Sequence, residues 1–370
     1  MQIDFHHSVT YVAARLAKFS SADANLISYS AQYVDEAINS GIVYFRNKAM
    51  YSRISSAHKM VDYRNFEELA NHHVWIPFHF LPGNGGEKAG DNPEGSFVNK
   101  LICHPNSHVA LDMVKSCIDC CEMEYGLHRL GITMHVLADT FAHQGFAGIN
   151  DKINKIDDIE CLGEEPRSLM EKIANYFGDL FDSAARRFVE EVLPLGHGAA
   201  LTSPDMPFLK WKYKNGLGKE IVRNNTEIFI DAVKSIHHAM VCYRIKNPNY
   251  SLTEDDQIPE EDLNKIRANF LAFDDEEGED RHEKWLASIS EGDFSFWEEG
   301  EVIQPFIPKG IGSWKFEALD TKREVETKNE KFRFNPEFLN SDWKLFHDAL
   351  QIHRMEVIRN ILPKYGICAA

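Results

Sequence analysis

The chain has 370 residues, a formal net charge of −17, 44% hydrophobic residues and seven scattered cysteines. This length allows one large core or two domains. No apolar run approaches the ~18 residues that a membrane-spanning helix needs. The acidic charge argues against a phosphate-backbone binding surface, and the odd number of cysteines favours reduced thiols over a disulfide framework.

Apolar residues recur at helical spacing in six segments, each of which predicts a helix: 9–19, 24–38, 108–142, 169–193, 224–244 and 343–361. A Gly-rich loop is predicted over 82–96, and residues 251–340 are expected to be irregular and acidic. Strand-like alternation is scarce. We therefore predict an all-α fold with a helical catalytic domain over 1–250 and a C-terminal extension over 251–370, whose last helix docks on the core.

Three potential metal ligands, His135, Asp139 and His143, recur at every fourth residue of an apolar run. On a helix these positions drift by only roughly 40° per step, so they share one face. An ionised aspartate in apolar surroundings needs a partner charge, and imidazole with carboxylate suits zinc. The alternative is a pair of ordinary core histidines beside a surface carboxylate. We predict a zinc site on this helix face.

Further candidate ligands lie in the first third of the chain. His6 follows closely on the Met1 α-amine, and Asp35 lies on an apolar-striped helix where a buried carboxylate would need a cation. His79 is flanked by large apolar residues and is either a ligand or a core histidine; His58 is a rival candidate.

A second group of candidates follows the predicted helix over 169–193. His197 and Asp205 lie in a Gly/Pro-rich loop, and loops of this kind often carry function. The alternative is that the two residues belong to a turn that only ends the helix.

These motifs resemble those of the zinc-dependent phospholipase C and P1-type nuclease superfamily, all-helical enzymes that bind three zinc ions. His135-x3-Asp139 is similar to the central motif of that superfamily, in which the aspartate bridges two zinc ions. Met1 and His6 look like its N-terminal ligands, although its members usually begin with Trp. The resemblance implies that further ligands come from Asp35, His58 or His79, and His143. The superfamily also supplies a later His and acid, but no HxxxE/D motif follows His143 in this chain, so His197 and Asp205 are taken as their substitutes. The resemblance also implies that Asp35 accepts the proton of the attacking water.

Within this superfamily, five segments look most like a bacterial zinc metallophospholipase C subfamily without signal peptides: 1–6, 53–58, 75–83, 138–144 and 196–198. The resemblance implies hydrolysis of glycerophospholipids such as phosphatidylcholine to diacylglycerol and a phosphorylated head group. Zinc would neutralise charge on the phosphodiester and lower the pKa of a bound water toward ~7. Some such enzymes of pathogens are delivered into host cells as virulence effectors.

The N-terminal segment has neither a basic region nor an apolar stretch, so no secretory signal is visible. We expect cytoplasmic synthesis, with any secretion or delivery into host cells following a signal-independent route. A lipid-cleaving enzyme must also touch its membrane transiently. The loop over 305–314, with Phe306 and Trp314, is the predicted contact, and burial of this loop in the core is the alternative.

Two other functions are compatible with these residues. A single-strand nuclease or 3′-nucleotidase would use the same metals, but it needs aromatic stacking platforms and positive potential. Three divalent cations would raise the net charge only to about −11, which favours a phospholipid substrate and no nucleic-acid partner. A helical interaction protein with structural histidines is the non-enzymatic alternative, and metal content would discriminate it.

Overall fold

The structure is a computed structural model that describes residues 1–58, 68–162, 196, 200, 202–323, 327 and 330–368. The longer helices are α1 (Thr10–Leu16), α2 (Ser21–Glu36), α3 (Glu68–Phe78), α5 (His108–Ile118), α6 (Gly126–Ala142), α9 (Asn225–Ile245), α10 (Glu260–Ala272), α11 (Gly278–Ser290) and α13 (Asp342–Met355). Short helices are α4 (Val98–Leu101), α12 (Trp314–Leu319), the π-helices η1 (Asp4–Val9) and η9 (Glu356–Ile361), and the 3₁₀ turns η3 (Asn84–Gly86), η4 (Lys152–Asn154), η6 (Ser203–Asp205), η7 (Glu254–Asp256), η8 (Pro336–Asn340) and η10 (Leu362–Tyr365).

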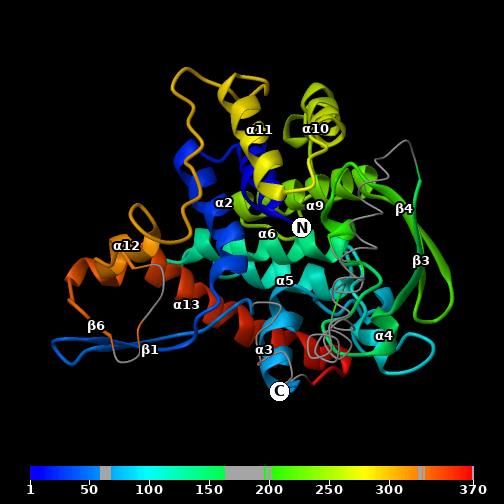
Figure 1. Ribbon diagram of the computed structural model, residues 1–370, viewed down its shortest axis with the longest axis horizontal. Helices are drawn as coiled ribbons and strands as arrows, with labels where there is room; N and C mark the ends of the chain where they lie inside the picture. Colours follow the sequence, from blue (N-terminus) through cyan, green and yellow to red (C-terminus); the bar gives the residue numbers. More distant parts are fainter. Residues whose placement is uncertain are drawn as a thin grey trace, which may run out of the picture.

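Two three-stranded sheets occur among the described residues, so the predicted all-α class is wrong and the fold is mixed. One sheet has the order β2-β1-β6, from β1 (Gly41–Phe45), β2 (Met50–Arg53) and β6 (Lys331–Phe332). The other has the order β3-β4-β5, from β3 (Ile156–Cys161), β4 (Lys210–Asn215) and β5 (Glu220–Asn224). Figure 1 shows the sheets at opposite ends of the helical body.

Local sequence explains both sheets. In β4, Trp211 and Tyr213 are buried between exposed or half-buried lysines, which is the two-residue period of a half-buried strand. A short turn over 216–219, with Gly218 at a positive φ, then leads the chain into antiparallel β5. In β1, Val43 and Phe45 are buried between exposed neighbours. These alternating segments are short, so their signal is weak beside the longer helical patterns elsewhere in the chain.

The body of the molecule is built around α6, which crosses its centre in Figure 1 and packs against α2, α9 and α13. Gly131 allows the closest of these contacts. A Cβ at Gly131 would lie 2.3 Å from the Ile27 carbonyl oxygen and 2.5 Å from the Ser30 Cβ. Glycine therefore lets α2 lie directly on α6, and the end of α2 comes to rest beside the His135 side chain.

The chain after residue 250 is more helical than its charge indicates. Helices α10 and α11 occupy the acidic stretch that was expected to be irregular, α11 packs on η1, and α13 packs on α6. The predicted helix over 108–142 is two helices, α5 and α6, separated by a turn. The predicted helix over 169–193 lies outside the described residues. None of the helices in the described ranges is both long enough and apolar enough to span a bilayer.

Candidate metal centre

Eight of the predicted ligands come together around α6, although they start from six parts of the chain. They are the Met1 amine, His6 on η1, Asp35 on α2, His79 just after α3, His135, Asp139 and His143 on and immediately after α6, and Asp205 on η6.

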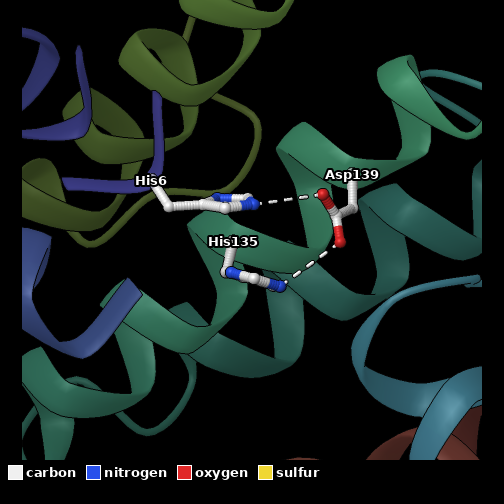
Figure 2. A group of neighbouring side chains, drawn as sticks. All are labelled: His6, His135 and Asp139. Carbon is white, nitrogen blue, oxygen red and sulfur yellow. Dashed lines mark ion pairs between the residues drawn. The ribbon is translucent and has the colours of Figure 1, made fainter. Parts of the chain in front are cut away.

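Asp139 lies at the middle of this cluster and uses both carboxylate oxygens. Its Oδ1 is 2.8 Å from the Met1 nitrogen and 3.2 Å from the His6 Nε2. Its Oδ2 is 3.2 Å from the His135 Nε2 and 3.3 Å from the His79 Nδ1. Figure 2 shows His6 and His135 directed at different oxygens of Asp139. A carboxylate divided between two sets of nitrogen ligands has the arrangement of a bridge between two cations.

Three imidazoles of the cluster are oriented by backbone carbonyls. The Nδ1–H of His135 donates to the Ala31 carbonyl at 2.9 Å, and the Nε2–H of His79 donates to the Ser56 carbonyl at 2.9 Å. The Nδ1–H of His143 donates to the His79 carbonyl at 2.7 Å. Each ring therefore keeps its other nitrogen as a lone pair for the cluster. Histidines that bind metals are held in this way by outer hydrogen bonds.

The lone pairs left by this arrangement face one another. The His135 Nε2 and His79 Nδ1 are only 3.2 Å apart, and the Asp35 Oδ1 lies 3.9 Å and 3.8 Å from them, respectively. Two lone pairs and a carboxylate repel one another unless a positive charge lies between them. A cation or an extra proton must therefore occupy this group.

The need for a cation is greatest at His6, because this residue is completely buried. Its ring stacks on His135 at a centroid distance of 3.8 Å and its Nε2 lies 3.2 Å from the Asp139 Oδ1. The Nδ1 makes no hydrogen bond to a described residue. Burial, followed by the repulsion from His135, lowers the pKa of His6 well below its usual range. The lowered pKa favours a neutral imidazole, the form that binds metals, and the Nε2 of His6 faces Asp139.

The charges of the cluster compensate for one another. Burial opposes ionisation of Asp139, but His143, the Met1 amine, His135 and His6 together hold the pKa of this carboxyl well below its usual range. Burial likewise opposes the charged Met1 amine, but Asp139 and Asp205 raise its pKa to about 11. Protons therefore stand where cations would bind, and metal binding would release them.

Asp205 lies at the far side of the amine. Its Oδ1 is 3.1 Å from the Met1 nitrogen and 3.7 Å from the His143 Nε2. His143, whose ring stacks on Phe80 at 4.5 Å, and Asp205 would together start a third ligand group.

One described candidate, His58, is not in the compact ligand groups of this cluster. The His58 ring packs edge-on against Trp75 at 6.4 Å, and the described groups of ligand atoms that lie within 4.8 Å of one another contain His79 but not His58. Of these rivals, the structure brings His79 to the cluster. His197 lies outside the described residues.

Sequence reasoning missed Arg281, a fully buried residue of α11. Its Nε donates to the Asp4 Oδ2 at 2.6 Å and its Nη2 donates to the Gln2 Oε1 at 2.5 Å. Its Nη1 donates to the carbonyls of Asp275 and Glu276. Arg281 thereby fixes the short segment between the Met1 amine and His6. Asp4 beside His6 was the only local signal, since its partner is 277 residues away in the chain.

A comparison with protein families matches residues 1–361 to a family of unknown function, DUF6765. The chain belongs to this family. No curated protein and no solved structure matches the chain. The matched range covers the whole cluster and also α11, which carries Arg281.

Proposed function

We propose that this DUF6765 member is a zinc-dependent phospholipase C that hydrolyses glycerophospholipids to diacylglycerol and a phosphorylated head group. The observation that carries this proposal is the set of lone pairs gathered around Asp139. His79 and His135 have both given their N–H groups to backbone carbonyls, and their remaining nitrogens lie 3.2 Å apart beside carboxylates.

The residues present fit metal ions. His6, His135 and Asp139 form one compact ligand group, and Asp35, His79 and His135 form another. Nitrogen and carboxylate donors of this kind are those that zinc prefers. In the proposed enzyme the deprotonated Met1 amine adds to the first group, and His143 and Asp205 contribute to a third. Bound zinc would supply positive charge for the phosphodiester and acidify water.

Asp35 is the proposed proton acceptor. Its side chain is 33% exposed, whereas that of Asp139 is only 2% exposed, so Asp35 is the cluster carboxylate that an incoming water meets. Burial raises the pKa of Asp35, although His135 and His79 oppose this effect. A carboxylate at the exposed edge of the cluster is positioned to accept the proton of an attacking water.

The acidic chain favours a lipid over a nucleic-acid substrate. A net charge of −17 repels a polyanion, whereas a phosphatidylcholine head group carries no net charge. One phosphodiester per substrate molecule requires positive charge only at the metal centre.

Elemental analysis of the purified protein, combined with hydrolysis assays, tests the proposal. We expect at least one zinc ion per chain and release of phosphorylated head group from phosphatidylcholine. Single-stranded DNA is the second substrate. Hydrolysis of DNA alone would identify a nuclease instead, and an active protein with less than one zinc ion per chain would overturn the metal mechanism.

A further inference from the structure

The sheet β2-β1-β6 has one buried and one exposed face. Val43, Phe45 and Phe332 are buried on the inner face, in a core cluster that also contains Phe338 and Trp343. The outer face exposes three large apolar side chains: Ile42 at 49%, Tyr44 at 42% and Met50 at 65%. Single exposed apolar residues are normal on a protein surface, but a contiguous exposed patch marks an interaction site.

These outer side chains form a continuous row. Tyr44 pairs with Met50 across the antiparallel β1–β2 ladder and with Lys331 across the parallel β1–β6 ladder. Paired residues of neighbouring strands point to the same face, so Met50, Tyr44 and Lys331 stand side by side. Ile42 lies two residues before Tyr44 on the same face. In Figure 1 this sheet projects from the side of the helical body.

The rim of this face is basic, although the chain as a whole is strongly acidic. Residues 41–53 contain no Asp or Glu. Arg46 and Lys48 lie exposed in the β1–β2 turn, and Lys331 and Arg333 lie exposed on and after β6. Within the described part of the chain, none of these four cations makes an ion pair; Glu330, the nearest carboxylate in sequence, pairs with Arg323 instead.

The hairpin is attached to the candidate metal centre at both ends. β1 begins six residues after Asp35. β2 is followed by Ser56, whose carbonyl accepts the hydrogen bond that orients His79. Short stretches of chain therefore connect the hairpin to Asp35 at one end and, at the other end, to the carbonyl that orients His79.

We propose that the outer face of this sheet, formed by Ile42, Tyr44, Met50 and Lys331 with the turn residues Arg46 and Lys48, binds an anionic phospholipid surface. Apolar and tyrosine side chains insert at the headgroup boundary, and lysine and arginine are attracted to anionic lipids. Salt screens charges that lie farther than the ~10 Å screening length from the bound lipid, which reduces the opposition from the acidic body.

The loop over 305–314, which the sequence predicts as the membrane contact, is mostly packed. Trp314 is 8% exposed and stacks on Tyr29 at 4.0 Å, and Phe306 lies 4.7 Å from the same ring. Only Ile311 is largely exposed among its large apolar residues. The hairpin face therefore replaces this loop as the membrane contact.

Cosedimentation of the full chain with vesicles tests the inference. The vesicles contain either phosphatidylcholine alone or phosphatidylcholine mixed with phosphatidylglycerol. We expect the Arg46→Ser/Lys48→Ser variant to bind mixed vesicles about 30-fold more weakly, at about fivefold per basic residue, with little change on neutral vesicles. The Ile42→Ser/Met50→Ser variant loses binding to both. Raised salt should weaken binding of the wild type to mixed vesicles.

Matched controls come from the sheet at the other end of the molecule. Val222 is 58% exposed on β5, and Lys214 is an exposed cation of β4 that pairs with Asp158. Val222→Ser and Lys214→Ser should bind like the wild type. Absence of binding by the wild type to mixed vesicles, or equal binding by all variants, would overturn the inference.

The inference rests on the proposed function only for the biological purpose of membrane binding. The binding assay itself measures no lipid hydrolysis. Hairpin variants that lose vesicle binding should still hydrolyse a soluble short-chain phospholipid. A protein that binds vesicles but hydrolyses no lipid would refute the proposed function, whereas the inference of a membrane-binding sheet face would stand.

Discussion

Asp4 belongs to the N-terminal segment and Asp139 faces this segment from α6, and each residue is 1% exposed. Their pKa values nevertheless move in opposite directions. Burial raises the pKa of Asp4 even though Arg281 opposes it. At Asp139 the effect of burial is overcome by His143, the Met1 amine, His135 and His6, and the pKa is lowered well below its usual range.

The difference lies in the partners. Arg281 carries a permanent charge, and each of its three nitrogens donates to an oxygen of the protein. The cation that pairs with Asp4 therefore keeps its charge without any ligand. Asp139 instead faces an amine and imidazoles, which are cationic only while they hold a proton. Such groups can exchange protons for metal ions, so equal burial produces a structural pair at one carboxylate and a candidate site at the other.

The sharpest test of this comparison replaces each carboxylate in turn. Asp139→Asn should lower kcat/KM roughly 10³-fold, because loss of a bridging charge removes several kcal/mol of charge stabilisation, and the zinc content should fall with it. Asp4→Asn should lose stability, and its zinc affinity should fall by no more than the roughly tenfold expected when the N-terminal segment is less fixed, so that it still binds zinc at saturating metal. Equal zinc content and activity in wild type and Asp139→Asn would refute the bridging role.

Removal of Arg281 should damage stability first and metal binding second. Arg281→Ala leaves Asp4 as an uncompensated buried charge, which costs about 3–5 kcal/mol of unfolding free energy, measured by urea denaturation. Arg281→Lys should recover part of this loss. Because the N-terminal segment is then less fixed, zinc affinity of the lysine variant should fall about tenfold or more. Wild-type affinity in that variant would show that Arg281 does not position the amine.

Buried histidines extend the comparison to pH. His237 lies on α9, and burial lowers its pKa to about 4, whereas its pKa in the unfolded chain is about 6.5. Between these values the unfolded state binds more protons, so stability is lost as pH falls from 6.5 to 4, by up to about 3 kcal/mol. His237→Gln should flatten the dependence of the urea midpoint on pH in this range. His104→Gln, at an exposed position, should leave it unchanged.

Chelation should lower the stability of the wild type but not that of Asp139→Asn. Its effect is the smallest of the stability changes expected here. If zinc at 100 times its dissociation constant is removed, the unfolding free energy falls by about 2.7 kcal/mol. The melting temperature of the wild type should drop on addition of a chelator and return with zinc. Asp139→Asn should show little change. A chelator that leaves the wild-type melting temperature unaltered would contradict metal binding in the folded state.

Sequence and structure agree best where the interaction is local. The spacing of His135, Asp139 and His143 placed three side chains on one helix face, and α6 carries the first two with His143 at its end. The Met1 amine and His6 also reach Asp139. Their roles as zinc ligands remain predictions. The two sheets were missed because strands of two to six residues give a weak periodic signal beside long helices.

The choice between His58 and His79 was beyond the sequence, because both follow plausible patterns. It depends on where the carbonyl of Ser56 lies relative to α6. The hairpin face was likewise hidden, since Ile42, Tyr44 and Met50 resemble ordinary core residues until the packing of Val43 and Phe45 fixes which side faces water.

The sequence by itself determined that His135, Asp139 and His143 share one face at α6 and that most of the chain is helical, because a helix repeats every 3.6 residues and its pattern depends on near neighbours. Only the tertiary structure decided that Arg281 holds the N-terminus, that His79 joins the cluster and that the first sheet exposes an apolar face. Each of these depends on groups far apart in the chain meeting within a few ångströms. Such contacts are set by how the helices pack, and packing has no period that a single sequence displays.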